Sequence, residues 1–209
     1  MKTIECFFDC SSPWTYLCFH NLQPLAAEFG VPIRWRPILV GGLFNTVNPS
    51  VYAARENPVP VKAAWQAKSL ADWSALAGLR IINPPPVFPV NSVKAMRACL
   101  VLQDDPARMT DFARRVFEAY WGRGEDISQD AVLAPLLSAA GLAPEMMFEA
   151  IGRADIKDAL RRNVDELIAR GGFGSPTMFI GGTDMYFGND RLMLLRGAIL
   201  RQRKAGKPA

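Results

Sequence analysis

The first forty residues alternate strand, helix and strand, and this order constrains the fold more than any other feature of the chain. Residues 4–10 (Ile-Glu-Cys-Phe-Phe-Asp-Cys) are rich in strand formers, which predicts a buried strand. A helix follows, with Ser12 at its N-cap, Pro13 at its first position and Gly30 beyond its end. Residues 31–40 predict a second strand. Two strands joined by one helix lie parallel in a single sheet.

We expect Pro24 to kink or interrupt the opening helix near Asn21.

The middle of the chain, after the second predicted strand, predicts helices and no further strand. Residues 41–60 predict a loop, because they contain Gly41-Gly42, Asn48-Pro49 and Asn57-Pro58. Six helical patterns follow, over residues 62–77, 92–103, 106–121, 129–140, 145–151 and 155–169.

The chain returns to strands at its end. Residues 177–180 and 183–187 predict a hairpin about Gly181-Gly182, and residues 190–203 a last helix with Asn189-Asp190 as its cap. Without the middle helices, the order is βαβ followed by helix, hairpin and helix, which is the thioredoxin-type arrangement. We therefore predict an α/β, thioredoxin-like fold (βαβ…αββα) with a large all-helical insertion. Residues 1–40 and 155–209 would form the thioredoxin-like domain, and residues 41–154 the inserted helical domain.

Composition narrows the functional classes. Half of the residues are hydrophobic, which excludes a disordered chain. No uncharged apolar run reaches the ~18 residues of a membrane span, and Glu5 and Asp9 lie too early for a signal peptide. We therefore expect a cytoplasmic protein without a membrane partner. The net charge is +4, and its excess lies between Arg34 and Arg97. These scattered bases argue against a nucleic-acid partner and fit either a solvated surface or a field that attracts small anions.

The cysteines and the single histidine exclude several chemistries. Cys6, Cys10, Cys18 and Cys99 form no Cys-x-x-Cys pair, so neither a metal site nor a disulfide is expected. Cys10 and Cys18 fit buried apolar positions better than reactive thiols. His20 lies eight residues beyond Ser12 on the same helix, about 12 Å away. This distance is too long for the nucleophile–base pair of a serine hydrolase.

Two segments mark a candidate site. Where redox proteins of this fold carry Cys-x-x-Cys, this chain has Ser12-Pro13-Trp14-Thr15, which cannot form a disulfide. Thiol exchange is therefore excluded unless Cys10 acts alone, while the helix start can still attract an anion. Pro176 precedes the third predicted strand, and a cis bond after Ser175 would expose that residue's backbone to an extended peptide. An ordinary loop proline is the alternative. Asp9 fits either a buried carboxylate beneath the site or a turn residue.

Three motifs in this order resemble one family. They are Asp9-x-x-Ser12-Pro13, Gly174-Ser175-Pro176-Thr177-Met178-Phe179 and Phe187-Gly188-Asn189-Asp190-Arg191. The chain resembles the 2-hydroxychromene-2-carboxylate isomerases, which are relatives of the kappa-class glutathione transferases in the DsbA-like thioredoxin superfamily. The resemblance covers nearly the whole chain, including the helical insertion.

The resemblance implies glutathione as cofactor and assigns residues to it. Ser12 would face the glutathione sulfur, and Ser175 before cis-Pro176 would pair with the cysteinyl backbone. Asn189 and Asp190 would hold the γ-glutamyl end. Lys62 would lie near the glycine carboxylate or the substrate, and Asn48 would match a loop asparagine of the family. Trp14 stands where Tyr or Phe is common.

The activity implied is a glutathione-dependent isomerisation of an aromatic, pyruvate-derived carboxylate in aromatic compound catabolism, by a homodimer. The basic residues between Arg34 and Arg97, Lys62 first, would receive the substrate carboxylate. Three alternatives stay open: a kappa-like transferase or peroxidase, a DsbA-like redox protein or peptide-binding chaperone, and a glutathione-binding module without chemistry.

Overall fold

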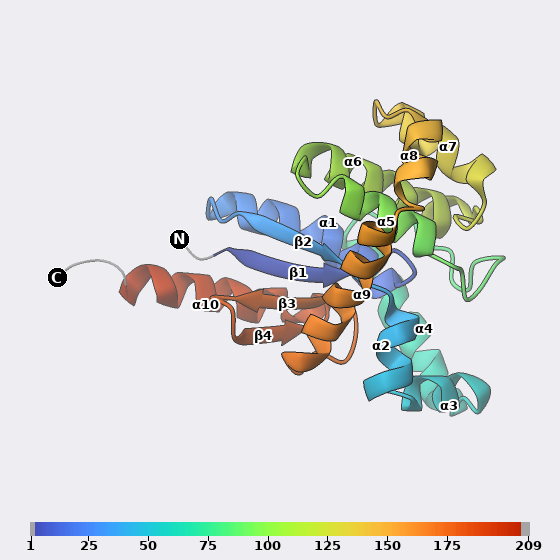
Figure 1. Ribbon diagram of the computed structural model, residues 1–209. Coiled ribbons are helices and arrows are strands. Elements are labelled where there is room, and N and C mark those ends of the chain that lie inside the picture. The colour runs from blue at the N-terminus through green and yellow to red at the C-terminus, as the bar shows by residue number, and fades with distance from the viewer. Residues whose placement is uncertain (1–2, 206–209) are drawn as a thin grey trace.

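The computed structural model describes residues 3–205, with side chains to residue 203, and its centre is a mixed four-stranded sheet (Figure 1). The strand order is β2-β1-β3-β4, with β1 (Ile4–Phe8), β2 (Ile33–Pro37), β3 (Thr177–Ile180) and β4 (Asp184–Phe187). β1 pairs with β2 in parallel and with β3 antiparallel, and β3 pairs antiparallel with β4. The predicted βαβ unit and the closing hairpin are confirmed.

Alternating side chains of β1 pack on opposite faces of the sheet. Ile4, Cys6 and Phe8 belong to the larger core cluster, shared with α1 (Pro13–Glu28) and α10 (Leu192–Ala205). Phe7 belongs to a second cluster, shared with α9 (Ala154–Ala169). β1 is apolar on both faces because helices cover both faces, as the short apolar pattern of residues 4–10 predicts.

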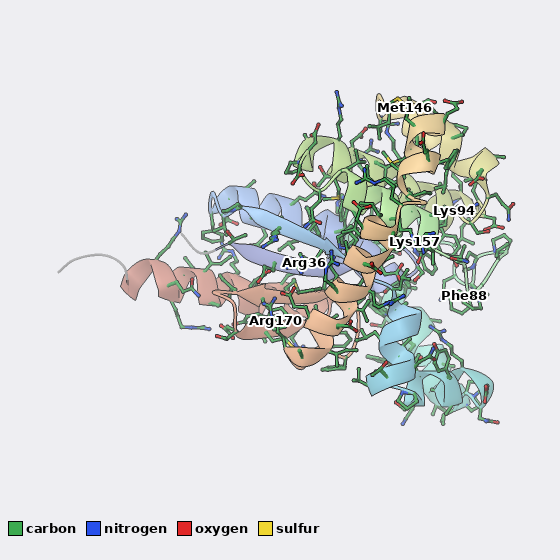
Figure 2. All side chains as sticks on the ribbon, viewed as in Figure 1. Arg36, Phe88, Lys94, Met146, Lys157 and Arg170 are labelled. Atoms are coloured by element: carbon green, nitrogen blue, oxygen red, sulfur yellow. The ribbon has the colours of Figure 1, made fainter. Side chains whose placement is uncertain are left out.

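A charged network lies on the α9 face of the sheet. Arg36 on β2 is 7% exposed and pairs with Glu5 at 3.2 Å and with Glu166. Asn163 Oδ1 accepts from Arg36 Nη2 at 2.7 Å, and Arg170 also pairs with Glu5, at 2.9 Å. Figure 2 shows Arg36 and Arg170 at this face, beside α9. Each buried charge therefore has a partner, as burial requires.

The segment between β2 and α9 consists of helices and their connections. Its helices are α2 (Val40–Val47), α3 (Ser50–Glu56), α4 (Pro60–Leu76), α5 (Val93–Val101), α6 (Pro106–Phe117), the π-helical turn η1 (Glu118–Gly122), α7 (Asp130–Ala139) and α8 (Pro144–Ala150). In Figure 1, α2, α3 and α4 gather on one side of the sheet end and α6, α7 and α8 on the other. The end of β1 and the start of α1 lie between these groups.

The loop predicted over residues 41–60 is wrong, because α2 and α3 occupy most of it. Leu43 of α2 is fully buried in a cluster with Val164 and Leu167 of α9. This tertiary packing outweighs the low helix propensity of Gly41-Gly42. α3 begins directly after Pro49, so the prolines that predicted a loop stand at helix boundaries instead.

Two predictions about helix ends are also corrected. α1 continues through Pro24 without interruption, because His20 and Pro24 lie on its exposed side, where water can replace the missing donor. Asn189 and Asp190 do not cap the last helix but form a 3₁₀ turn, η2 (Asn189–Arg191), before α10. Asn189 is 3% exposed and its Oδ1 accepts from Asn21 Nδ2 at 3.0 Å, so this oxygen is engaged elsewhere.

Within residues 3–205, no individual helix has the length and apolar character needed to cross a membrane. Only α7 and α8 taken together reach the required length and composition, and they are bent by 116°.

Candidate active site

The candidate site lies where β1 ends and α1 begins. Ser12 is the N-cap of α1 and has extended backbone dihedral angles, and its Oγ accepts a hydrogen bond from Thr15 N at 3.2 Å. Pro13 occupies the first helical position, where a missing N–H removes no helical hydrogen bond. The same Ser12 Oγ donates to the carbonyl oxygen of Ser175 at 3.4 Å. The hydroxyl therefore lies at the positive end of the helix dipole, against the segment before β3.

The Ser175–Pro176 peptide bond is cis, as the sequence predicts. Ser175 Oγ accepts from Asp9 N at 3.2 Å and is 2.8 Å from Thr15 Oγ1, so its side chain is held from two elements. Within residues 3–205, the backbone N–H of Ser175 donates to no partner. This segment can therefore pair with an added extended chain.

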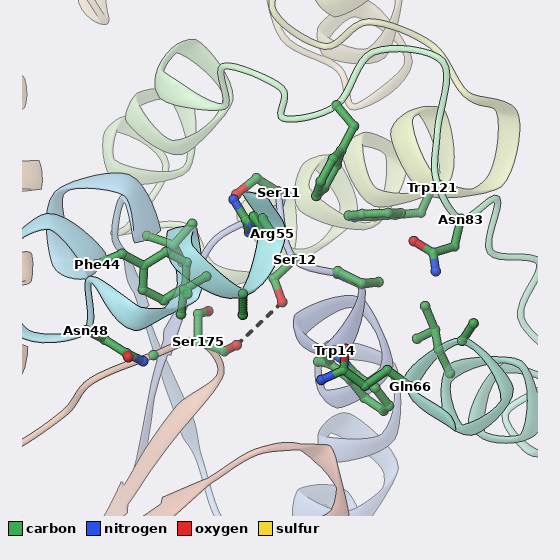
Figure 3. A pocket seen from close by; sticks show the side chains of 18 of the residues that line it. Ser11, Ser12, Trp14, Phe44, Asn48, Arg55, Gln66, Asn83, Trp121 and Ser175 are labelled. Carbon is green, nitrogen blue, oxygen red and sulfur yellow. Dashed lines mark hydrogen bonds between the residues drawn. The ribbon is translucent and has the colours of Figure 1, made fainter. Parts of the chain in front are cut away.

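A cavity of about 480 Å³ opens beside these residues (Figure 3), within the ~300–1,000 Å³ of small-molecule sites. Ser12, Trp14 and Ser175 form one wall. The others come from α2, α3, α4 and the loops before α5 and β3, and their residues include Phe44, Asn48, Val51, Arg55, Ala63, Gln66, Ala67, Leu70, Asn83, Phe88, Gly174 and Phe187. Trp121 also lines it, and its Nε1 donates to the Cys10 carbonyl at 2.9 Å.

Asp9 is a buried carboxylate beneath this site, 1% exposed. Its Oδ1 accepts from Ser11 N and its Oδ2 from Val40 N, both at 2.9 Å. Burial raises the pKa of Asp9, while these bonds and Ser92 act in the opposite direction. Asp9 therefore ties together the end of β1, the start of α1 and the start of α2.

The protein's own thiols are closed to this cavity. All four cysteines are buried and free, and Cys10 is 0% exposed. Burial raises the pKa of Cys10 well above its usual range, which opposes thiolate formation. Burial raises the pKa of Cys99 in the same way. Between residues 3 and 205, no three side chains of His, Cys, Asp or Glu lie together as metal ligands would.

The remaining predicted residues lie in two places. Asn48 lines the cavity, and its Nδ2 donates to Phe173 O at 3.2 Å. Lys62 is exposed on the first turn of α4 and does not line the cavity, although its neighbour Ala63 does. Asn189 and Asp190 line a separate cavity of about 370 Å³.

This second cavity lies farther along α1, and shares no lining residue with the first. Asn21 and Trp73 also line it, and Asn21 is eight residues beyond Pro13, or about 12 Å along the helix. The Nδ2 of Asn189 is buried without a hydrogen-bond partner. A buried, unpaired donor at a cavity wall can receive an acceptor from a ligand.

Sequence reasoning missed most of the cavity wall, including the polar or aromatic residues Gln66, Asn83, Trp121 and Arg55. Gln66 follows the predicted Lys62 by four residues, so the helical spacing of α4 contained a signal for it. Asn83 and Trp121 come from segments whose approach depends on how the helices pack. Arg55 was one of many scattered bases in the sequence, and among the described residues it is the one charged side chain that lines the cavity.

The arrangement suits a small anionic ligand with an extended backbone. A hydroxyl and a helix N-terminus face one point of the cavity, and the free backbone N–H of Ser175 lies beside it. A ligand that carries a thiol at this point would have its anionic form stabilised. Within the described chain, no cysteine supplies that sulfur.

Comparison with known proteins agrees with these features. The model of the DSBA-like thioredoxin domain matches residues 3–200. The 2-hydroxychromene-2-carboxylate isomerase of Pseudomonas sp. (strain C18) is 31% identical over 204 residues, covering 94% of this chain and 89% of that protein. Human glutathione S-transferase kappa 1 is 25% identical over 207 residues, covering 93% and 89%. A solved structure of a 2-hydroxychromene-2-carboxylate isomerase superimposes with a TM-score of 0.80 at 23% identity, covering 97% of each chain.

Proposed function

This chain belongs to the family of DSBA-like thioredoxin domains, among relatives that are isomerases and glutathione transferases, and we propose that it is a glutathione-dependent isomerase. Its substrate would be an aromatic, pyruvate-derived carboxylate of the 2-hydroxychromene-2-carboxylate type. The proposal includes a role in aromatic compound catabolism, a cytoplasmic location and a homodimeric assembly.

One observation carries the proposal: the cavity at the start of α1 presents the hydroxyl of Ser12, and every cysteine is buried away from it. A redox protein of this fold needs its own accessible thiol there. A serine in that position can instead donate a hydrogen bond to the sulfur of a ligand. Curated relatives named as glutathione transferases support glutathione as that ligand.

The predicted residues would hold glutathione at three points along its length. Ser175 would pair with the cysteinyl backbone through its free N–H, and Asn48 lies at the same cavity. Asn189 and Asp190 would hold the γ-glutamyl end, where Asn189 Nδ2 lacks a partner. Pro13 lines the first cavity and Asn21 the second, and the two residues lie about 12 Å apart along α1. Lys62 would contact the glycine carboxylate from the rim.

In this mechanism Ser12 and the start of α1 stabilise negative charge on sulfur. When bound, glutathione would supply a nucleophilic thiolate for reversible addition to the conjugated enone of the substrate, and it would be regenerated in each turnover. A hydrogen bond to a charged group contributes roughly 1.5–3 kcal/mol and a helix start about 0.3–1 kcal/mol. Lowering a thiol pKa by about 2 requires ~2.7 kcal/mol. The two groups are sufficient, and no additional base is required.

The test is isomerisation of 2-hydroxychromene-2-carboxylate by the purified protein with and without glutathione. We expect acceleration only with glutathione, while the thiol concentration stays constant. Equal rates without glutathione would contradict the proposed cofactor. Full activity in Ser12→Ala would remove Ser12 from its role.

A kappa-like transferase or peroxidase is the second candidate, because several curated relatives at 25–27% identity are named kappa transferases. Consumption of glutathione in step with turnover would favour it. A DsbA-like redox protein is disfavoured by the burial of Cys10. Insulin reduction that depends on Cys10 would support it.

A further inference from the structure

A third cavity, of about 380 Å³, adjoins the active-site cavity. The two share Ser11, Val40, Phe44, Arg55 and Phe88 as lining residues. The walls of the third cavity are otherwise mainly apolar, with Leu39, Tyr52, Val90 and Val93 among them. We call it the side chamber. Ser11 lines both cavities and directly precedes Ser12, whose hydroxyl is assigned to the sulfur, so a molecule seated in the side chamber would lie close to the reacting atoms.

Arg55 stands at the boundary of the two spaces. Its guanidinium carbon lies 5.3 Å from the ring centre of Phe88 and 5.9 Å from those of Phe44 and Tyr52. These three rings flank the charge and orient it. Figure 3 shows Arg55 among the residues that line the active-site cavity, together with Ser11 and Ser12.

The charge of Arg55 is uncompensated by any ion pair. Within residues 3–205, none of its nitrogens lies within 4.0 Å of a carboxylate oxygen. Among the side chains described up to residue 203, the active-site cavity contains no other charged lining residue, and the side chamber adds only Asp9. Both oxygens of Asp9 already accept backbone N–H bonds. Arginine binds carboxylates through two parallel hydrogen bonds, and it is more weakly hydrated than lysine.

We propose that Arg55 receives the carboxylate of the second substrate and that the side chamber holds its aromatic ring. The inference rests on the proposed function and names the residue that selects an aryl 2-oxo acid over a neutral electrophile. The substrate carboxylate was first assigned to Lys62. Arg55 suits it better, because Lys62 lines neither space, whereas Arg55 lines both.

The test uses a ligand that binds without reacting. Isothermal titration calorimetry without glutathione measures the affinity for 4-phenyl-2-oxobutanoate, which has the ring and the carboxylate but no enone, and for its methyl ester. We expect Arg55→Gln to lower the affinity for the acid roughly tenfold to hundredfold and the affinity for the ester less than about twofold. Arg55→Lys should recover part of the affinity. The control, Lys68→Gln, removes an exposed cation of α4 outside both cavities and should leave both affinities unchanged.

Two further measurements test the chamber and the alternative ligand. Val93→Phe fills the side chamber only, and it should lower the affinities for the acid and for the ester equally. Glutathione affinity, titrated separately, should stay within about twofold of the wild type in both variants. Thermal melting of each variant confirms that it is folded.

Three results would overturn the inference. The first is that Arg55→Gln loses affinity for glutathione while its affinity for the acid is unchanged. The second is that Arg55→Gln lowers the affinities for the acid and the ester equally. The third is that the wild type does not bind the acid. The proposed function is tested apart from it. Wild-type protein that binds the acid through Arg55 but does not isomerise with glutathione would refute the function and keep the inference. A glutathione-dependent isomerase whose affinity for the acid is unchanged by Arg55→Gln would keep the proposed function and refute the inference.

Discussion

Ser12→Ala should raise the pKa of the bound glutathione thiol, because it deletes the hydroxyl that faces the sulfur. In the free protein this hydroxyl makes two bonds, accepting from Thr15 N at 3.2 Å and donating to Ser175 O at 3.4 Å. The donated bond is long, so it can be exchanged for a bond to a thiolate at little cost. Substitution therefore affects both the helix cap and the charge on sulfur.

The two effects have different magnitudes. Loss of the cap costs about 1 kcal/mol of stability when alanine replaces serine, but only a few tenths when glycine does. Loss of a hydrogen bond to a charged sulfur costs roughly 1.5–3 kcal/mol, which raises the thiol pKa by roughly 1–2. With a wild-type value of ~6.5, the thiolate fraction at pH 7 then falls about three- to twenty-five-fold.

Glycine provides the matched control. Ser12→Gly should match Ser12→Ala in the pKa of the bound thiol, measured by the ultraviolet absorbance of the thiolate across a pH titration. Ser12→Gly should nevertheless be more stable than Ser12→Ala by about 0.5–1 kcal/mol in urea denaturation. Ser11→Ala controls for an adjacent hydroxyl at the same cavity, and should change neither quantity much.

A bound thiol that titrates at the same pH in Ser12→Ala and in the wild type would show that the Ser12 hydroxyl does not lower the thiol pKa. A low thiol pKa in Ser12→Gly but not in Ser12→Ala would also contradict this role of the hydroxyl. That second result would assign the effect to helix geometry and not to the hydroxyl.

Four further predictions concern stability, titration and access. Arg36→Met should lower the free energy of unfolding by about 2 kcal/mol, since it removes the donors to the buried Asn163 Oδ1 and leaves Glu5 and Glu166 to share Arg170. Lys68→Met at an exposed pair should cost at most about 0.5 kcal/mol in the same urea assay. Burial raises the pKa of Asp9, so the folded protein keeps this proton to a higher pH than the unfolded chain does. The free energy of unfolding relative to Asp9→Asn should therefore fall as the pH rises from the ordinary Asp pKa of ~3.9 through the raised pKa of the folded state. A difference between the two proteins that does not change with pH in urea titrations would contradict this. Gly174→Ala places a Cβ 2.5 Å from Cε2 of Phe187, so Phe187 must move; we expect a loss of about 1 kcal/mol and weaker glutathione binding by calorimetry, and unchanged affinity would show that this ring does not shape the site. The four cysteines should resist an aromatic disulfide reagent in the folded protein and react on unfolding, and rapid labelling of any one in the native state would refute their burial.

The sequence predicted the sheet because its signals are local. Residues 4–8 and 177–180 are short apolar runs, and Ser12-Pro13 and Gly181-Gly182 are boundaries with a direct backbone cause. The same local signals located Ser12 and Ser175. Their approach across 163 positions followed from the order of elements, since β1 and β3 pair in the sheet.

The helical segment was harder to predict for two physical reasons. α2 contains Gly41-Gly42, and its helical state depends on Leu43 packing against α9, more than a hundred residues later. Arg55 has no pattern that separates it from other bases. Its role arises from three rings that fold around it, one from the loop before α5. Cavities bounded by several helices depend on how those helices pack, which periodicity does not encode.

The origin of the cavity walls has an evolutionary consequence. Ser12 and Ser175 belong to the sheet-forming ends of the chain, whereas Phe44, Arg55 and Phe88 belong to the helical segment between them, Phe88 in its loop before α5. Mutations in the intervening helices can therefore retarget such an enzyme toward new electrophiles while its sulfur-activating half is inherited unchanged. Grafting that segment between homologues should transfer substrate preference and spare the handling of the thiol.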